Sequence, residues 1–419
     1  MGYTRRLVDQ ELDELLPALP AIALQGPKGV GKTSTALPRA TTIFTLDDDA
    51  VRETTQARPA RVVEAAPPVL IDEWQRVPST WDHVRRAVDA GAPLGSFILT
   101  GSTAPPGASV HSGAGRIVDL RMRPLSLAER GLCEPSASLA ALLRGEAPPE
   151  ADSPVSLEQY ADEVLRSGFP GIRRLPERGS RRALDSYLAR IVEREFPEQG
   201  LRVRRPEVLR DWLRAYAAAT ATTASYTAIL DAATPGQNAK PAKSTTIAYR
   251  DVLAQLWLLD PLQAWQPSSG LGPVGRSPKH FMADPALAAR LLELDMGRLL
   301  DGASPGAPAR GGSALGALFE HLVALSLLAY AQVNEARVGH FRTRGGDREI
   351  DVIVEKNGRV AAFEVKLSST ITDRDVRHLR WLRDRYGDRV ASTAVITPGP
   401  HAYRRADGVD VIPAALLGV

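Results

Sequence analysis

The chain has 419 residues, of which 44% are hydrophobic and 24% are charged, and its formal net charge is +3. The length leaves room for about three domains, the composition is that of an ordinary soluble protein, and the charge alone does not imply a nucleic-acid partner. The single cysteine, Cys133, excludes an internal disulfide and a cysteine-rich zinc site. No stretch approaches the apolar length of a membrane-spanning helix. We therefore predict a cytoplasmic protein with no membrane partner.

Over residues 1–130, apolar runs of strand length alternate with helical patterns. This alternation is typical of an α/β domain with a parallel sheet. The predicted strands are AIALQG from residue 21, TTIFTLDD from 41, PVLIDEW from 68, SFILTGS from 96 and RIVDLRM from 116.

The turn after the first predicted strand carries a phosphate-binding sequence. It reads GPKGVGKT and matches the P-loop pattern G-x-x-x-x-G-K-[ST] at every fixed position. Its glycines let backbone N–H groups close around phosphate oxygens, Lys32 can reach the β- and γ-phosphates, and the Thr33 hydroxyl can bind Mg²⁺. A helix after the loop would place its N-terminus at the anion. We predict ATP and Mg²⁺ as cofactors, held by Gly26, Pro27, Lys28, Gly29, Val30, Gly31, Lys32, Thr33 and Ser34.

An acidic pair, Asp72-Glu73, ends the third predicted strand. Asp72 would hold the metal directly or through water, and Glu73 would polarise the attacking water. An acidic pair at a strand end is more often part of a turn, but together with the P-loop it predicts ATP hydrolysis.

The same pair resembles the Walker B motif of the AAA+ ATPases and their relatives. The stretch FILTGS is similar to their sensor strand, which implies that Thr100 or Ser102 contacts the γ-phosphate or the water. The following stretch, GAGRIVDLRMRPLSLAE, is similar to one bacterial and archaeal group of this family. That resemblance makes Arg116 a candidate arginine finger for a neighbouring subunit's ATP, with a surface arginine as the alternative. It also implies a homo-oligomer, such as a hexameric ring.

The middle of the chain has mostly helical patterns. We expect a helical lid or linker over residues 131–200, beginning in a Pro/Ala/Ser-rich boundary or long loop. Over 201–274, a Ser/Thr cap, an amphipathic helix and a short apolar strand have the layout of a helix-turn-helix with a wing. There, Lys240, Lys243 and Arg250 would meet DNA phosphates or form a solvated basic loop.

A second α/β domain is expected over residues 275–419, with a Gly/Pro-rich loop before a long apolar helix. The turn signal KNG predicts a hairpin that brings Asp351 beside Glu364 and Lys366. Two carboxylates and an ammonium suit Mg²⁺- or Mn²⁺-assisted phosphodiester hydrolysis. A buried ion network is the alternative.

The spacing D-x(12)-E-x-K resembles the restriction-endonuclease-like, PD-(D/E)xK, nuclease core. In that core a glutamate on the preceding helix joins the site, which implies metal binding by Glu320, Asp351 and Glu364 and a catalytic role for Lys366. Only seven of the 52 basic residues are lysines, namely Lys28, Lys32, Lys240, Lys243, Lys279, Lys356 and Lys366. A compact ammonium is thus kept at both predicted sites. The residue before Asp351 is Ile350 and not proline, which departs from the motif.

The whole chain resembles AAA+-like ATPases with a winged-helix middle and a C-terminal restriction-endonuclease-like domain. The leading interpretation is an ATPase that moves or remodels DNA, with a C-terminal module that binds or cleaves it. An alternative is a nucleotide-controlled switch or protein-remodelling ATPase whose C-terminal module only recognises a partner. A small-molecule kinase is a third reading, which the Asp72-Glu73 pair and the LTGS strand disfavour.

Overall fold

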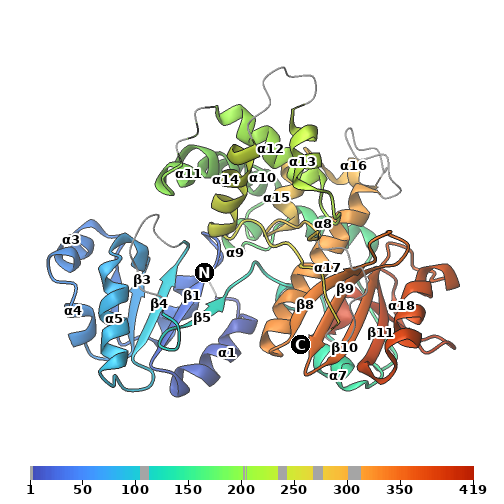
Figure 1. The fold of residues 1–419 in the computed structure, drawn as a ribbon, viewed down its shortest axis with the longest axis horizontal. Coiled ribbons are helices and arrows are strands. Elements are labelled where there is room, and N and C mark those ends of the chain that lie inside the picture. Colours follow the sequence, from blue (N-terminus) through green and yellow to red (C-terminus); the bar gives the residue numbers. More distant parts are fainter. Residues whose placement is uncertain are drawn as a thin grey trace.

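The computed structural model describes residues 3–103, 113–201, 203, 205–234, 243–267, 277–300 and 313–419. Figure 1 shows three modules, with an N-terminal module on one side, a C-terminal module on the other and helices above and between them. We call these the N-terminal module (residues 3–130), the helical module (156–300) and the C-terminal module (135–152 and 313–419).

The N-terminal module is a five-stranded parallel sheet with the order β2-β3-β4-β1-β5. β1, β3 and β4 are almost entirely buried, as expected for central strands of a sheet covered on both faces. All five predicted strands and their parallel arrangement are confirmed. The strands are β1 (Ala21–Gln25), β2 (Thr42–Thr45), β3 (Val69–Asp72), β4 (Phe97–Gly101) and β5 (Val118–Arg121). The helices are α1 (Leu7–Leu15), α2 (Lys32–Ala36), α3 (Asp49–Ala57), α4 (Arg61–Glu64), α5 (Ser79–Asp89) and α6 (Leu127–Arg130).

The helical module begins at a capping box, in which Ser156 and Gln159 satisfy the first turn of α8. Three successive helices, α12, α13 and α14, are followed by a short hairpin with the bridges Leu259↔Met282 and Leu262↔Lys279. The predicted amphipathic helix corresponds to α14, and the bridged segment after it lies where the short apolar strand was predicted; the helix-turn-helix with a wing stays a prediction. Residues 268–276 and Lys240 lie outside the described residues. The helices are α8 (Leu157–Leu165), α9 (Pro170–Arg173), α10 (Glu177–Arg190), α11 (Phe196–Glu198), α12 (Pro206–Ala218), α13 (Tyr226–Ala233), α14 (Lys243–Gln255), α15 (Pro285–Leu291) and α16 (Met296–Leu300), with a π turn, η4 (Ile191–Glu195), after α10.

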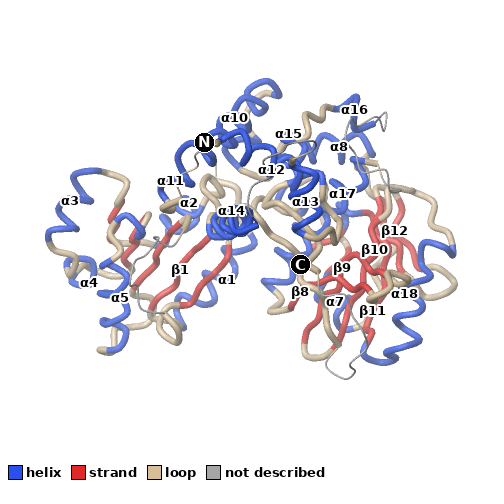
Figure 2. Tube along the Cα trace, turned by 45° about the horizontal axis from the view of Figure 1, so that its top comes forward, coloured by secondary structure: helices blue, strands red, loops and turns tan. Residues whose placement is uncertain are grey.

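The C-terminal module is a seven-stranded mixed sheet with the order β7-β12-β13-β11-β10-β9-β8. Asn357 and Gly358 both have positive φ, and they form the predicted turn between β9 and β10. Figure 2, in which strands are red, shows this sheet and the N-terminal sheet as separate bodies. The remaining elements are β8 (Arg337–Arg342), β9 (Glu349–Lys356), β10 (Arg359–Val365), β11 (Val390–Thr397), β12 (His401–Arg404), β13 (Asp410–Pro413), α17 (Ala314–Val333) and α18 (Asp373–Tyr386).

Two predicted boundaries differ from the structure. The Pro/Ala/Ser-rich passage expected in the lid belongs to the C-terminal module, because β6 (Ala137–Ser138) pairs with β14 (Leu417–Gly418) and β7 (Ala151–Asp152) pairs with β12. Between them, α7 (Leu139–Arg144) buries its leucines against β10 and β11. Residues 277–300, expected in the C-terminal domain, supply α15 and α16, and α15 packs on α8, α10 and α12 of the helical module.

The expectation about apolar stretches was wrong for α17. By length and composition alone this 20-residue helix could cross a membrane, with a mean hydropathy of 1.6 in its most apolar window. However, 67% of that window is buried inside the protein, where α17 packs on α1, α8, α15 and β8. A core helix of this kind is apolar on all sides.

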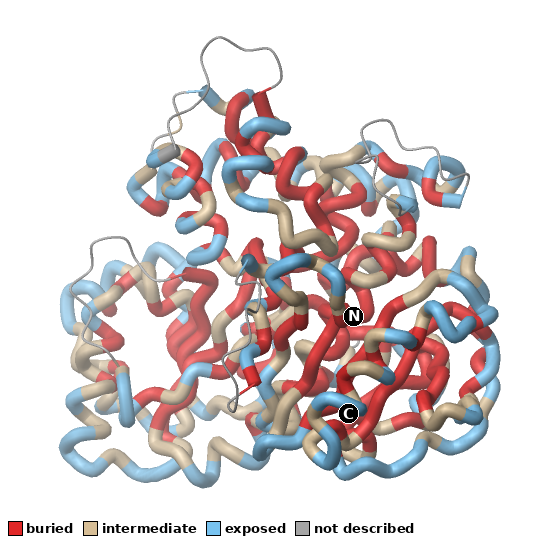
Figure 3. The backbone as a smooth tube through the Cα atoms, turned by 45° about the vertical axis from the view of Figure 1, so that its right-hand side comes forward, coloured by how far each residue is buried: buried red, intermediate tan, exposed pale blue. Residues whose placement is uncertain are grey.

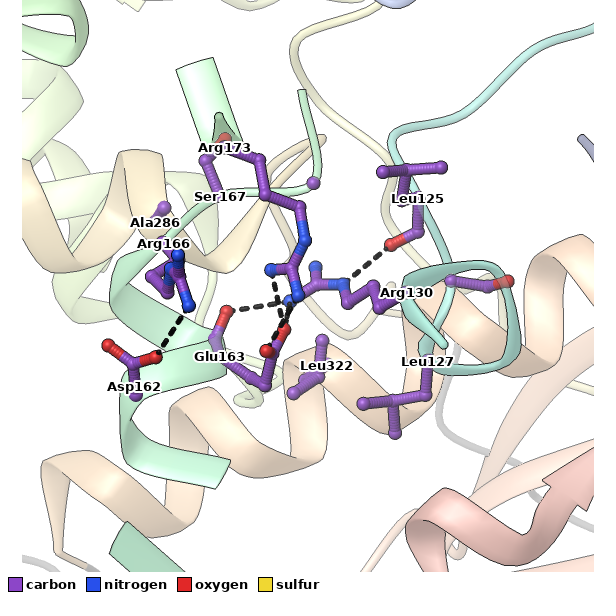
Figure 4. A network of polar contacts seen from close by, with 12 residues as sticks. Leu125, Leu127, Arg130, Asp162, Glu163, Arg166, Ser167, Arg173, Ala286 and Leu322 are labelled. Carbon is purple, nitrogen blue, oxygen red and sulfur yellow. Dashed lines mark hydrogen bonds and ion pairs between the residues drawn. The ribbon is translucent and has the colours of Figure 1, made fainter. Parts of the chain in front are cut away.

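A continuous hydrophobic core joins the three modules, and a buried ion network joins two of them. One hydrophobic cluster contains Leu12 of α1, Tyr216 of α12 and Phe363 of β10, and Figure 3 shows red, buried segments in several parts of the molecule. Arg130 of α6 and Arg173 of α9 converge on Glu163 of α8, at 2.9 and 2.7 Å (Figure 4). Burial acts to raise the pKa of Glu163, yet the two arginines hold it below its usual value. The N-terminal module is therefore anchored to the helical module.

Candidate functional site

The carboxyl ends of β1, β3 and β4 meet at one edge of the N-terminal sheet. β4 lies between the other two strands, and Thr100 is in register with both Leu24 and Asp72. The loop 26–31 leaves the end of β1 at the same edge. Ligands of open parallel sheets bind at this edge. The predicted P-loop and acidic pair therefore form one site.

The loop requires its glycines. A Cβ on Gly26 would lie 2.2 Å from the carbonyl oxygen of Met122, so no side chain fits there. Gly31 has a φ of +108°, which L side chains rarely adopt. The helix that follows, α2, has only five residues before a 3₁₀ turn, in which Pro38 cannot supply an N–H.

Lys32 lies buried under the loop. It is 4% exposed, and its ammonium donates to the carbonyl oxygens of Gly26 at 2.8 Å and Pro27 at 3.0 Å. Burial lowers the pKa of Lys32 to about 8, although Glu73 and Asp72 oppose this shift. A buried ammonium held by carbonyl oxygens alone is suited to an incoming phosphate, so the loop fits a nucleotide.

Thr33 and Asp72 are arranged as a metal site of a P-loop enzyme requires. The Thr33 hydroxyl donates to Asp72 Oδ1 at 2.7 Å, and the Thr100 hydroxyl donates to the same oxygen. Thr100 is fully buried and positions Asp72, and its contact with the γ-phosphate or the water stays a prediction. Ser102, the other predicted option, lines the cavity. The residues present therefore fit Mg²⁺, which Thr33 and Asp72 would hold.

Glu73 stands at the mouth of the same cavity with a φ of +57°. This backbone conformation is uncommon for a residue other than glycine and typical of functional sites. Burial raises the pKa of Glu73, and Lys32 opposes the shift. Its Oε2 accepts a hydrogen bond from Gln75 at 2.5 Å. A carboxylate with a raised pKa suits the orientation of an attacking water.

The cavity, with a volume of about 550 Å³, is shared by two modules. The N-terminal module contributes Thr33, Asp72, Glu73 and Ser102 among others. The helical module contributes residues that sequence reasoning missed: Tyr187, Arg190, Ile191, Arg194, Glu195, Leu256 and Leu258. Their distance from the P-loop in sequence gave no local signal, although Arg190 at the end of α10 and Arg194 in η4 are a usable signal for an anion.

An ion pair crosses the cavity from the P-loop to the helical module. Lys28 Nζ lies 2.7 Å from Glu195 Oε1 and 3.6 Å from Glu198 Oε2. The Tyr187 hydroxyl also donates to the carbonyl oxygen of Lys28 at 3.2 Å. Glu195 ends the π turn η4, a type of irregularity that is frequent at functional sites. The P-loop and the helical module are thus directly coupled.

Arg116 lies away from this chain's own P-loop. It precedes β5, whose first residue is in register with Ile22 near the start of β1, so it lies at the opposite edge of the sheet. Its guanidinium pairs with Asp89, the last residue of α5, at 2.6 Å. From there it cannot contact this chain's own nucleotide, and its action on a neighbouring subunit stays a prediction.

The four residues predicted for the C-terminal site do converge. Lys366 Nζ lies 2.8 Å from Glu364 Oε2 and 4.0 Å from Asp351 Oδ2. Glu320 and Asp351 both contact a further residue, Lys279, at 2.6 and 2.8 Å. Sequence reasoning did not place Lys279 in the site, although the scarcity of lysine was a usable signal.

The C-terminal site does not have the geometry of a metal centre. Within the part of the chain that the structure describes, no group of three or more histidine, cysteine, aspartate or glutamate side chains could hold a metal ion. The Lys279 ammonium lies between Glu320 and Asp351, which were predicted as ligands. The predicted Mg²⁺ or Mn²⁺ at this site therefore has no support.

Comparison with known proteins divides the chain in a similar way. A family model described as an AAA domain matches residues 19–130, and two domains of unknown function, DUF8612 and DUF4143, match 157–298 and 315–417. Two relatives are the uncharacterized proteins Rv2008c of Mycobacterium tuberculosis and Mb2031c of Mycobacterium bovis. Each is 27% identical over 421 residues, which cover 99% of this chain and 84% of the relative.

Two solved structures are also similar in part. The Walker-type ATPase PABY2304 of Pyrococcus abyssi has a TM-score of 0.40 and 17% identity, over 68% of this chain and 94% of that one. The Aeropyrum pernix ORC2 protein has a TM-score of 0.27 and 13% identity, over 68% and 90%.

The AAA match and the geometry of the site agree. Residues 19–130 are an ATPase domain of the AAA kind, with a P-loop fold that implies use of a nucleotide and Mg²⁺. The C-terminal module is a mixed sheet with helices, and its match is to a domain without an assigned function.

Proposed function

We propose that the chain is a nucleotide-controlled switch, in which ATP at the P-loop sets the position of the helical module and the C-terminal module recognises a partner without catalysis. The cavity carries this proposal, because Thr33, Asp72 and Glu73 face Arg190, Arg194 and Glu195 across it. A ligand that contacts both modules stabilises the arrangement of the modules that binds it more tightly. The shift between two arrangements is set by the difference in the ligand's affinity for them.

Lys28 would transmit the change. A triphosphate on the loop brings negative charge beside Lys28 and competes with Glu195 for the ammonium. Glu195 is 8% exposed, so losing its partner leaves a buried carboxylate and favours movement of η4. Arg190 and Arg194, which line the same cavity, would turn toward the phosphates.

Hydrolysis would reset the switch. Glu73 orients the attacking water, Lys32 neutralises phosphate charge, and Thr33 and Asp72 hold the metal, which supplies charge neutralisation at the phosphates. Loss of the γ-phosphate returns Lys28 to Glu195. In a homo-oligomer such as a hexameric ring, Arg116 of one subunit would complete the site of the next.

Hydrogen exchange tests the switch. ATP with Mg²⁺ should change exchange in α10 and η4 of the wild-type protein, and Lys32→Ala should abolish that change. Glu195→Gln should tighten ATP binding several-fold, because Lys28 is released. Glu193→Gln is the matched control, since Glu193 lies on the same π turn but pairs with Arg210 at 2.9 Å. Equal affinities for the two variants, with no ATP-dependent exchange in η4, would refute the proposal.

A second candidate is action on DNA, with the C-terminal module binding or cleaving it. It is supported by the order of α12, α13, α14 and the hairpin that follows. On α14, however, Ile247 is 41% exposed, and Arg250 pairs with Asp251 and stacks over Tyr226. Among the α14 side chains that the structure describes, these two have little to offer a phosphate backbone, while Lys240 and the side chain of Lys243 lie outside the described residues.

Phosphate release from ATP separates the two candidates. It should be measured with and without duplex and branched DNA, with Lys32→Ala as the blank. Stimulation by DNA that weakens steeply with added salt would favour the second candidate. Turnover that is indifferent to DNA supports the switch.

A further inference from the structure

The C-terminal module contains a largely buried centre built from four carboxylates and two ammonium groups, of which Glu349 and Lys366 are each 33% exposed. Glu320 comes from α17, Glu349 and Asp351 from β9, and Glu364 and Lys366 from β10 or its end. Lys279 comes from a different part of the chain, the hairpin of the helical module. The centre is therefore completed by a residue from outside the sheet that supplies most of its carboxylates.

The Lys279 side chain is 1% exposed and lies among three of these carboxylates. Its Nζ is 2.6 Å from Glu320 Oε1, 2.8 Å from Asp351 Oδ1 and 3.8 Å from Glu349 Oε1. A carboxylate oxygen binds a divalent cation at about 2.0–2.6 Å. The ammonium and a metal ion would therefore need the same space between Glu320 and Asp351.

The backbone holds Lys279 in this place. Its N–H and carbonyl pair with Leu262, each at 2.9 Å. The other strand of the hairpin continues into Trp265, whose N–H donates to the carbonyl of His340 in β8 at 2.7 Å. The hairpin thus extends the β8 edge of the C-terminal sheet, and the lysine is inserted from that edge.

We propose that Lys279 is the resident cation of this centre, taking the position of a divalent metal and latching the helical module to a C-terminal module that does not cleave nucleic acids. Lys366 supplies a second fixed charge, through Glu364 and Asp351. The latch is independent of nucleotide turnover, because none of its residues lines the ATP cavity.

The ionisation of the centre agrees with this role. Burial acts to lower the pKa of Lys279, but Asp351 and Glu320 raise it above its usual value, so the ammonium stays charged. Burial and Asp351 raise the pKa of Glu320 to about 7, and they also raise that of Glu364. Both shifts favour the protonated form of these two carboxyl groups and so act to reduce the negative charge of the centre.

Binding of Mn²⁺ to the full chain without nucleotide tests the proposal. Titration followed by electron paramagnetic resonance should give the same number of bound ions for the wild type and for Lys356→Ala, which removes a lysine at the end of β9 outside the centre. Lys279→Ala should bind one additional Mn²⁺, and adding Glu320→Gln should remove it. A folded Lys279→Ala protein that binds no additional ion would overturn the proposal.

A second test compares the wild type with Glu320→Gln, and it does not depend on whether Lys279→Ala folds. Glu320→Gln should leave the number of bound Mn²⁺ unchanged, because no ion occupies the centre. Incubation of linear and branched DNA with Mg²⁺ or Mn²⁺ should give no product that Glu320→Gln abolishes. Loss of a bound ion, or of a cleavage product, in Glu320→Gln would show a working metal centre and overturn the assignment of Lys279.

Discussion

Lys32 and Lys279 are both buried lysines, but their surroundings are opposite. Lys32 meets carbonyl oxygens of its own loop, and burial lowers its pKa to about 8. Lys279 meets the carboxylates of Glu320 and Asp351, which raise its pKa despite burial. The ammonium of the first lysine contacts only neutral carbonyl oxygens, with Glu73 and Asp72 acting on it from farther away, whereas the second lysine forms direct ion pairs with two carboxylates. Burial of a lysine therefore does not by itself indicate a ligand site. A buried lysine indicates one when no carboxylate of the chain is in direct contact with it.

The difference extends to what surrounds each lysine. Thr33, Asp72 and Glu73 line an open cavity of about 550 Å³ beside Lys32. The centre around Lys279 is closed on one side by the hairpin that carries the lysine itself. The nucleotide site is thus open to a ligand that binds and leaves, whereas the ion pairs of the C-terminal centre are formed within the chain and stay in place.

Replacing Lys32 should have the largest effect. Lys32→Ala removes the ammonium that an ATP phosphate would pair with, so turnover should fall by about 1,000-fold or more, chiefly through lost binding. The measurement is steady-state phosphate release together with the Kd of a fluorescent ATP analogue. Lys356→Ala, with the same loss of charge at a distance, should leave both unchanged. If Lys32→Ala still bound ATP, Lys32 would not be the residue that pairs with the phosphates, and its proposed difference from Lys279 would be wrong.

Glu73→Gln should separate binding from chemistry. The amide cannot accept the proton of an attacking water, so turnover should fall by about 100- to 1,000-fold while the Kd for ATP stays within a few-fold of the wild type. Glu53→Gln, on the exposed side of α3, controls for the change of charge. Normal hydrolysis by Glu73→Gln would assign the orientation of water to another residue.

Stability should respond in opposite directions to the same substitution at the two lysines. Lys279→Met leaves Glu320 and Asp351 buried without their partner and should cost about 3–5 kcal/mol. Lys32→Met removes a desolvated charge and should be neutral or stabilising by about 1 kcal/mol without ATP. Differential scanning calorimetry of both variants measures this contrast, and a loss of similar size in both would contradict it.

The residues predicted for the nucleotide site could be found in the sequence because their signals are local. The P-loop glycines, Lys32 and Thr33 lie within eight consecutive positions, and Asp72 directly ends a buried strand. Lys279 is 41 residues from Glu320 and 72 from Asp351, so its role depends on tertiary packing. The position of α7 also depends on tertiary packing, because its leucines form an apolar pattern that does not indicate which sheet they cover.

The smallest predicted effect is a proton linked to ATP binding. At pH 9 a Lys32 with a pKa of about 8 is mostly neutral, and nearby phosphates favour the charged form by raising that pKa. Binding at pH 9 should therefore take up about 0.9 proton, and affinity should fall by up to about tenfold per pH unit above 8 and change little below 7. Isothermal titration calorimetry in two buffers of different ionisation enthalpy measures the uptake. Glu73→Gln removes the neighbouring carboxyl group, whose pKa burial raises, so proton uptake that persists in this variant belongs to Lys32. Absence of uptake would show that Lys32 is charged before ATP arrives.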